Sequence, residues 1–289
     1  MEVSSMRECP VPKGVLLIIG GHENKGEDPK SQSQKEHPNP LEILKVFVEQ
    51  LDTEDPAIEI VTTAGSLNEE TFREYFDAFK QLNVRRINHI LHNSRDEVIR
   101  DTSALDRLEK ADGIFFTGGD QLKLTSLYGG TDFLLMLKKR YIEENIVIAG
   151  TSAGAMALST PMIYAGNEDV QQVTGEIKVT VGLEFLKDAC IDTHFIDRHR
   201  FVRMAQVIAS NPSAIGLGIG EDTAMLVKDG NKAEIKGSGI VVVIDGFEVS
   251  HSNILDFGDK VPLSIRNLRV HLLTSGDIYE IPQINPPHL

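Results

Sequence analysis

The sequence of 289 residues has only two cysteines, Cys9 and Cys190, which are too few for a disulfide framework and show no zinc-binding spacing. A reducing compartment is therefore the simpler expectation. Apolar runs are also short. No stretch approaches the roughly 18 residues of a membrane-spanning helix, and the N-terminal residues lack the apolar segment of a signal peptide. These absences lead us to expect a cytoplasmic protein.

Basic residues are scarce: 29 lysines and arginines stand against 43 aspartates and glutamates, which gives a formal net charge of −14 at pH 7. Such a charge argues against general binding to a nucleic-acid backbone. The glycine patterns of dinucleotide-binding loops and of P-loops are missing as well. Internal repeats and linker-like changes in composition are also absent. We therefore expect one α/β domain over residues 1–289, with a core from about residue 14 to about residue 275.

The pattern of apolar residues predicts a mostly parallel sheet with helices on both faces. Strands are expected at 14–21, 57–62, 86–91, 112–117 and 146–149, with helices at 41–51, 68–80, 103–110, 122–127 and 132–143 between them. Additional antiparallel strands, interrupted by a helix at 197–210, are expected in the C-terminal third. Residues 26–40 are polar and contain prolines, so they predict a long mobile loop.

A short apolar run at 146–149 is followed directly by Gly150-Thr151-Ser152-Ala153-Gly154 and then by good helix formers. Strand, G-x-S-x-G and helix are the arrangement of a nucleophile elbow, whose tight turn exposes the serine hydroxyl. The Ala153 N–H would then lie at a helix start, where it could bind a developing oxyanion. The alternative interpretation is a chance Gly/Ser turn, since the bare pattern is common.

Two other loops follow predicted strands. Gly118-Gly119 comes after the strand at 112–117, and such a glycine pair could supply a second oxyanion donor. This loop would face the elbow if the two strands are neighbours in the sheet. His22 to Lys25 comes after the first strand, where sites of α/β proteins often lie. A plain surface turn is an equally good interpretation of the second loop.

A serine nucleophile needs a base, usually a histidine that a carboxylate orients. Among nine histidines, His194 is distinctive because it ends a predicted strand that leads into a basic loop. Glu221 follows an apolar strand and a glycine, so it is the candidate orienting acid. Asp192, two residues before His194, is a rival for that role. For each of these residues a structural role is the alternative.

Arg198, His199, Arg200 and Arg203 form the densest basic cluster in this acidic chain. Arg200 and Arg203 are one helical turn apart and could share a face. The cluster indicates either salt bridges on a helix surface or recognition of substrate carboxylates by arginine. The sequence does not decide between these two interpretations.

Four motifs together resemble the cyanophycinase family of serine peptidases. This family is part of the aspartyl dipeptidase (peptidase E) clan, with a class I glutamine amidotransferase-like (flavodoxin-like) fold. The motifs are GTSAGA at 150–155, GGDQ at 118–121, D-x-H-F at 192–195 and GIGED at 218–222. They occur in the family's order and at similar spacing, so the resemblance extends from about residue 14 to about residue 275.

The resemblance implies specific roles. Ser152 would be the nucleophile, His194 the base and Glu221 the orienting acid, while the N–H groups of Gly119 and Ala153 would form the oxyanion hole. Six further residues would bind the substrate: Gln121, Asp192, Thr193, Arg198, Arg200 and Arg203. No metal and no cofactor are implied.

The family hydrolyses cyanophycin, a poly-aspartate backbone that carries arginine on each β-carboxyl, and releases β-Asp-Arg dipeptides from the C-terminal end. The resemblance thus implies a homodimeric serine exopeptidase that works through an acyl-enzyme. Threonine at 193 and histidine at 199 depart from the usual glutamine and glycine, and these differences bear on the substrate more than on the chemistry.

A dipeptidase for Asp-X or isoaspartyl peptides is an alternative hypothesis, and a catalytically silent binding protein is another. A glutaminase is disfavoured because that chemistry usually employs cysteine, whereas position 152 is serine.

Overall fold

The structure is a computed structural model that describes residues 10–26, 39–166, 174, 176–256 and 261–282. The predicted mobile loop at 26–40 lies almost entirely outside the described residues. None of the helices in the described part of the chain combines the length and the apolarity needed to cross a bilayer.

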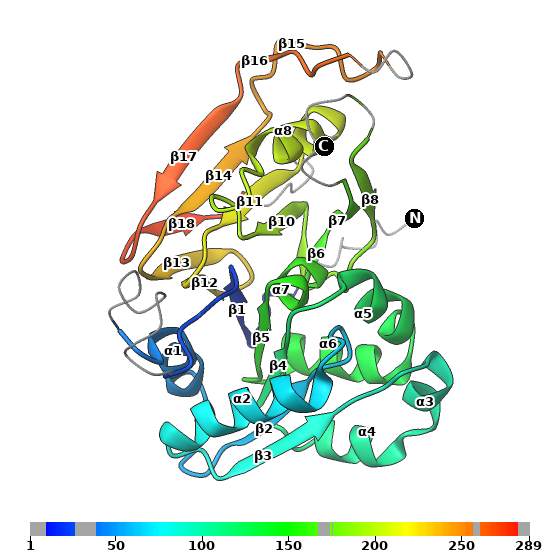
Figure 1. Ribbon diagram of the computed structural model, residues 1–289, viewed down its shortest axis with the longest axis vertical. Coiled ribbons are helices and arrows are strands. Elements are labelled where there is room, and N and C mark those ends of the chain that lie inside the picture. The colour runs from blue at the N-terminus through cyan, green and yellow to red at the C-terminus, as the bar shows by residue number, and fades with distance from the viewer. Residues whose placement is uncertain (1–9, 27–38, 167–173, 175, 257–260, 283–289) are drawn as a thin grey trace, which may run out of the picture.

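The larger sheet has eight strands in the order β18-β13-β12-β1-β5-β4-β2-β3 (Figure 1). Its parallel part has the strands that the sequence predicted in the first half: β1 (Val15–Ile19), β2 (Ala57–Val61), β3 (Arg86–Ile90), β4 (Gly113–Phe116) and β5 (Val147–Thr151). Three antiparallel strands extend it: β12 (Thr223–Lys228), β13 (Lys232–Gly237) and β18 (Ile278–Glu280). The prediction of a mostly parallel sheet is confirmed.

Helices cover both faces of this sheet. On one face lie α1 (Glu42–Glu49) and α2 (Asn68–Gln81), which pack on Leu17, Ile19 and Phe115. On the other face lie α3 (Arg95–Arg100), α4 (Thr102–Leu108), α5 (Gln121–Tyr128) and α6 (Asp132–Glu143). Successive residues of β1 belong alternately to the two apolar clusters, as the period-two geometry of a strand requires.

The chain after the elbow also builds a second sheet, in the order β17-β14-β11-β10-β6-β9. Its strands are β6 (Ser159–Thr160), β9 (Leu186–Lys187), β10 (Ala189–Thr193), β11 (Ile215–Ile219), β14 (Val241–Asp245) and β17 (Arg269–Leu273). Two short ribbons complete the described strands: β7 (Met162–Ala165) with β8 (Lys178–Thr180), and β15 (His251–Ser252) with β16 (Ile265–Arg266). The sequence predicted additional antiparallel strands in this part of the chain, but neither their division between two sheets nor the parallel pairing of β10 with β11.

The predicted helix at 197–210 is four residues shorter at its start, since α8 runs from Phe201 to Ser210. His199 has a positive φ of 50°, which a helix does not allow, so residues before Arg200 form turns.

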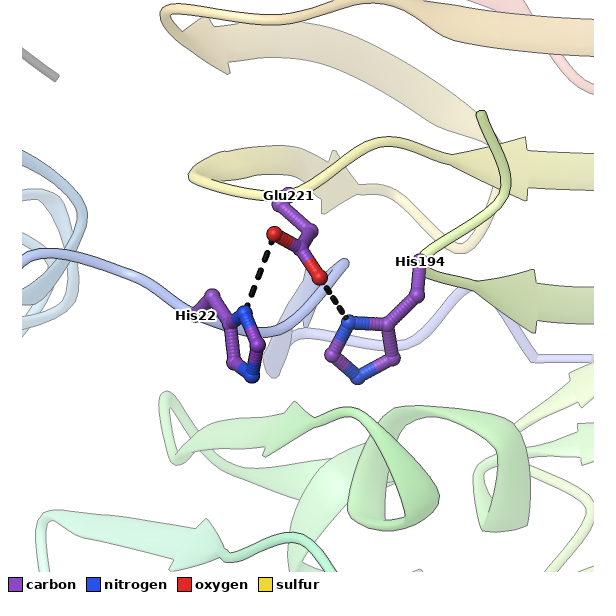
Figure 2. A group of neighbouring side chains, drawn as sticks. All are labelled: His22, His194 and Glu221. Carbon is purple, nitrogen blue, oxygen red and sulfur yellow. Dashed lines mark hydrogen bonds and ion pairs between the residues drawn. The ribbon is translucent and has the colours of Figure 1, made fainter. Parts of the chain in front are cut away.

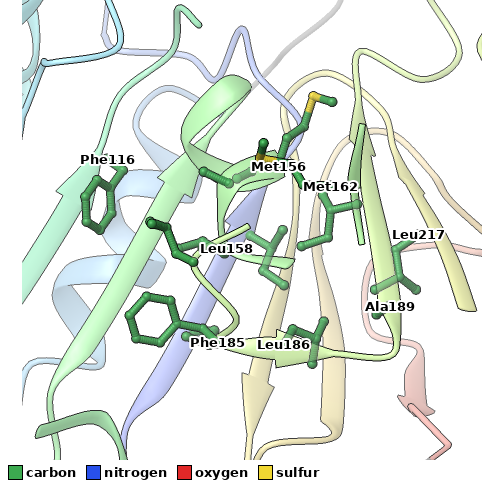
Figure 3. Packing of buried hydrophobic residues seen from close by; sticks show 14 of the residues in the cluster. Phe116, Met156, Leu158, Met162, Phe185, Leu186, Ala189 and Leu217 are labelled. Carbon is green, nitrogen blue, oxygen red and sulfur yellow. The ribbon is translucent and has the colours of Figure 1, made fainter. Parts of the chain in front are cut away.

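One apolar cluster joins the two sheets. It contains Phe116 of β4, Leu158 after the elbow helix α7 (Ala153–Ala157), and Ala189 and Leu217 of β10 and β11 (Figure 3). Because this cluster is continuous, the two sheets are held against each other along the side where β5 ends. The single domain over residues 1–289 stays a prediction.

Candidate active site

Ser152 occupies the sharp turn between β5 and α7. Its φ of 52° and ψ of −117° place a non-glycine residue in a rarely populated region, which is the strain expected of a nucleophile elbow. A side chain at Gly150 would overlap the backbone of Gly154, and one at Gly154 would overlap the backbone of Phe116. The two glycines therefore allow the tight turn, in agreement with the reasoning from the sequence.

Ser152, His194 and Glu221 form a continuous hydrogen-bonded chain. The Ser152 Oγ lies 2.9 Å from the His194 Nε2, and the His194 Nδ1 lies 2.6 Å from the Glu221 Oε1. Figure 2 shows the second of these contacts, with the carboxylate above the two imidazoles. The structure thus brings together the three side chains that the sequence proposed, whereas their catalytic roles stay predictions.

These three side chains come from different parts of the fold. Ser152 follows β5 of the larger sheet, His194 follows β10 of the second sheet, and Glu221 lies in the connection from β11 to β12 that passes between the sheets. The chemistry is therefore placed where the carboxyl ends of strands from both sheets meet.

The glycine pair after β1 holds the three segments together through its backbone. The Ile19 carbonyl accepts from the Ser152 N–H at 3.1 Å, and the Gly20 carbonyl accepts from the His194 N–H at 2.9 Å. The Gly21 carbonyl accepts from the N–H of Asp222, next to Glu221, at 2.9 Å. Residues 19–21 are thus the common support of all three side chains.

The electrostatic surroundings suit a base at His194. Burial lowers the pKa of His194 from its ordinary value of 6.5, and the nearby charges of Arg198 and His22 lower it further, against the opposing hydrogen bond and charge of Glu221. Burial alone would raise the pKa of Glu221, but the hydrogen bond from His194 and the charge of His22 outweigh burial and lower it. The imidazole is therefore neutral near pH 7 while the carboxylate is charged, as proton abstraction requires.

His22 makes a second contact with the same carboxylate, because its Nδ1 lies 3.0 Å from the Glu221 Oε2. Its ring packs edge-on against that of His194, with 4.9 Å between centroids. Three side chains here could together hold a divalent cation: His22, His194 and Glu221. Each offers one ligand atom, and these atoms lie within 4.8 Å of one another in the described part of the chain. In this structure the Glu221 carboxylate contacts the Nδ1 atoms of both histidines, and the Nε2 of His194 contacts Ser152.

A cavity of about 400 Å³ opens beside Ser152 and His194. Its walls include Gly118 and Gly119 after β4, Arg198 of the basic loop, and residues of α2 and of the loop after β1. The strands β4 and β5 are paired, so the Gly118-Gly119 loop does face the elbow. A side chain on Gly119 would overlap the backbone of Ala64, which explains the glycine there.

The predicted oxyanion donors belong to residues near the nucleophile: Ala153 follows Ser152 in the chain, and Gly119 follows Gly118. Gly118 contacts Ser152 so closely that an added Cβ would lie 3.3 Å from the Ser152 Cβ. Within the described residues, the N–H groups of Gly119 and Ala153 have no backbone acceptor. This leaves both groups available, although their role in catalysis stays a prediction.

The three arginines of the basic cluster have different surroundings in the structure. Asp192 is fully buried and binds the guanidinium groups of both Arg200 and Arg203, the former at 2.9 Å. Arg203 also donates to the carbonyl of Gly166 at 3.0 Å. Arg200 and Arg203 therefore share one buried carboxylate inside the protein, whereas Arg198 is exposed and lines the cavity.

The other residues predicted to bind the substrate do not line the described cavity. The Gln121 side chain donates to the carbonyl of Ile163 at 2.8 Å, and the Thr193 hydroxyl is buried without a hydrogen-bond partner in the described part of the chain. Asp192 does not orient His194, since its carboxylate is taken by the arginines. Of the six residues predicted to bind substrate, Arg198 lines the described cavity, and the substrate-binding roles of all six stay predictions.

One cavity residue, Tyr75, was missed by reasoning from the sequence, and its partner Glu23 was included only as part of the loop from His22 to Lys25. Glu23 and Tyr75 line the cavity, and the Tyr75 hydroxyl donates to the Glu23 carboxylate. The loop after the first strand had been singled out as a possible site. Nothing local indicates, however, that its carboxylate meets a tyrosine 52 positions away on α2.

Comparison with known proteins identifies the family of this chain. The model of peptidase family S51 matches residues 30–235, which is more than half of the chain. A curated cyanophycinase of Synechococcus elongatus is 32% identical over 269 residues, covering 93% of this chain and 80% of that protein. A cyanophycinase of Trichormus variabilis is 28% identical over 278 residues, covering 96% and 89%.

Among solved structures, a peptidase from an acI-B1 actinobacterium superposes with a TM-score of 0.62 over 94% of this chain and 98% of that chain, at 18% identity. That likeness concerns the fold alone, and it supports the flavodoxin-like architecture expected from the sequence. The family resemblance that the motifs indicated is thereby confirmed. The chain belongs to peptidase family S51 and is a serine peptidase.

Proposed function

We propose that this protein is a serine-type exopeptidase that hydrolyses cyanophycin to β-Asp-Arg dipeptides through an acyl-enzyme. The observation that carries the proposal is the hydrogen-bonded chain from Ser152 through His194 to Glu221, open to a cavity beside the elbow. The substrate is supported by the curated relatives, which are cyanophycinases.

In the proposed reaction each of these groups has one role. Neutral His194 takes the proton of Ser152 as the Oγ attacks the substrate carbonyl carbon, and Glu221 stabilises the imidazolium that forms. The N–H groups of Gly119 and Ala153 bind the oxyanion. The C–N bond then breaks as His194 returns the proton to the leaving amine. Finally, water hydrolyses the ester with His194 again acting as base.

Arg198 is assigned to the substrate's free carboxylate. Its guanidinium is exposed, lines the cavity and has no ion-pair partner among the described residues. A guanidinium binds a carboxylate in a bidentate manner, which would fix the C-terminal end of the polymer next to the nucleophile. This placement accounts for release of units from one end of the chain.

The test is turnover of purified cyanophycin by Ser152→Ala, with products identified by mass spectrometry. The wild type should release β-Asp-Arg, and the variant should lose at least about 1,000-fold in rate while keeping its circular dichroism spectrum and melting temperature. Release of other dipeptides from small Asp-X substrates, with the polymer untouched, would favour the dipeptidase alternative. Undiminished turnover by Ser152→Ala would refute the assignment of the nucleophile.

We also propose that the enzyme is cytoplasmic and forms a homodimer, the latter from the family resemblance alone. Light scattering coupled to size-exclusion chromatography tests the dimer, and fractionation of the source cells tests the location. A monomer at micromolar concentration would contradict the first of these proposals.

A further inference from the structure

Glu23 is a buried carboxylate in the wall of the active-site cavity. It is 4% exposed, and both of its oxygens accept hydrogen bonds, one from the Tyr75 hydroxyl and one from the Thr151 hydroxyl at 2.7 Å. Burial, together with the adjacent Glu23 charge, raises the pKa of Tyr75 well above its ordinary value, so the phenol keeps its proton. Both donors are therefore neutral groups, and neither brings a positive charge to the Glu23 carboxyl group.

No cation among the described residues pairs with Glu23. Lys25, the nearest lysine in sequence, donates instead to Glu74 at 2.7 Å, and its ammonium lies 4.7 Å above the Tyr75 ring. A buried carboxylate without a counter-charge is costly, and in a cavity wall a ligand can supply that charge. The protein therefore carries a site for a cationic group within the same cavity as its nucleophile.

The hydrogen bonds also define the shape of that group. A carboxylate has about four acceptor positions, and two are used here, one on each oxygen. One position per oxygen remains, which matches the two parallel N–H groups of a guanidinium better than the single point charge of an ammonium.

The site is close to the reacting atoms. Thr151, which donates to Glu23, directly precedes Ser152, and Glu23 follows Gly21 and His22 in the loop that supports the catalytic segments. Resting on the function proposed above, we propose that Glu23 is the specificity-determining residue that binds the arginine side chain of the substrate unit next to the scissile bond. Glu23 and Arg198 then recognise opposite charges of one β-Asp-Arg unit.

The experiment compares two short substrates built from β-Asp-Arg repeats, identical except that citrulline replaces arginine in the terminal units. Citrulline keeps the shape of arginine but is neutral. The wild type should prefer the arginine substrate by about 30- to 100-fold in kcat/KM. This ratio corresponds to the usual free-energy contribution of a hydrogen bond to a charged group. Glu23→Gln should lose most of this preference, through a lower rate on the arginine substrate and a nearly unchanged rate on the citrulline substrate.

Glu74→Gln is the matched control, because it removes another carboxylate from the cavity lining that Lys25 already pairs. It should change the preference by less than about threefold. A merely structural role for Glu23, holding Thr151 and the elbow, predicts equal losses on both substrates and slower labelling of Ser152 by a fluorophosphonate. That outcome would overturn the proposal, and so would equal rates of the wild type on the two substrates, even if Glu23→Gln does not fold.

Failure of the proposed function has a different signature. If the wild type hydrolyses neither substrate, the cation site is still measurable by protection of Ser152 from the fluorophosphonate. Agmatine, a guanidinium without a carboxylate, should slow labelling of the wild type but not of Glu23→Gln. Equal protection of the two proteins would reject the site independently of the peptidase substrate.

Discussion

At the scale of single residues, the basicity of His194 determines the pH range in which the enzyme works. Burial, the main cause, lowers the pKa of His194, and the charge of Arg198 is the next lowering cause. A lower pKa means that the imidazole remains neutral down to a lower pH. It can therefore still accept the Ser152 proton under mildly acidic conditions. The acid limb of kcat/KM for the wild type should therefore lie below pH 6.5, the ordinary value for histidine.

Arg198→Met removes the charge beside His194 and should move this limb to higher pH, whereas Arg198→Lys keeps the charge and should leave the limb in place. Both variants should lose substrate affinity, because lysine does not reproduce the bidentate contact. The position of the limb, measured as kcat/KM against pH, separates the two effects. Equal shifts in both variants would show that the charge of Arg198 does not act on His194.

At the scale of elements, the loop after β1 holds the ends of β5, β10 and β11 in register. Gly21 has a φ of 99°, and an added side chain would overlap the ring of His194. Gly21→Ala should therefore displace the imidazole and lower kcat/KM by about 100-fold or more, the size of effect expected from a shift of about 1 Å. Steady-state kinetics on the proposed substrate would measure it.

Gly276 offers a matched control for this variant. It has a similar φ of 89°, but an added side chain would meet nothing within 4 Å. Gly276→Ala should cost about 1 kcal/mol of stability from backbone strain and leave kcat/KM unchanged. If the two variants lose activity equally, strain rather than contact with His194 would be the cause.

At the scale of the whole molecule, the apolar cluster that joins the two sheets predicts that they unfold together. Leu158 is fully buried in this cluster, and its carbonyl accepts the N–H groups of Phe185 and Leu186 at 2.9 and 3.1 Å. Leu158→Ala should destabilise the protein by about 2–5 kcal/mol and lower one common transition. Calorimetry with coincident optical probes measures it, and two separate transitions would contradict the predicted single domain.

Much of the fold could be predicted because its signals are local. The run Val15–Ile19 is apolar at every position, as expected for a strand that is covered on both faces of the sheet, and the G-x-S-x-G turn follows a strand and begins a helix, which is the context that makes the motif specific. The division of the later strands between two sheets could not be predicted. It depends on which strands pair, and β11 and β12, although consecutive, belong to different sheets.

The same contrast holds for the site. The sequence by itself determined the candidates: Ser152 in its elbow, His194 after a strand, and Glu221 or Asp192 as the acid, with the three roles assigned by the family resemblance. Only the tertiary structure decided which charged side chains already have partners within the protein. Asp192 forms ion pairs with Arg200 and Arg203, while Glu23 accepts hydrogen bonds from Tyr75 and Thr151. The physical reason is that the availability of a charge depends on partners far away in the chain, and no local pattern records them.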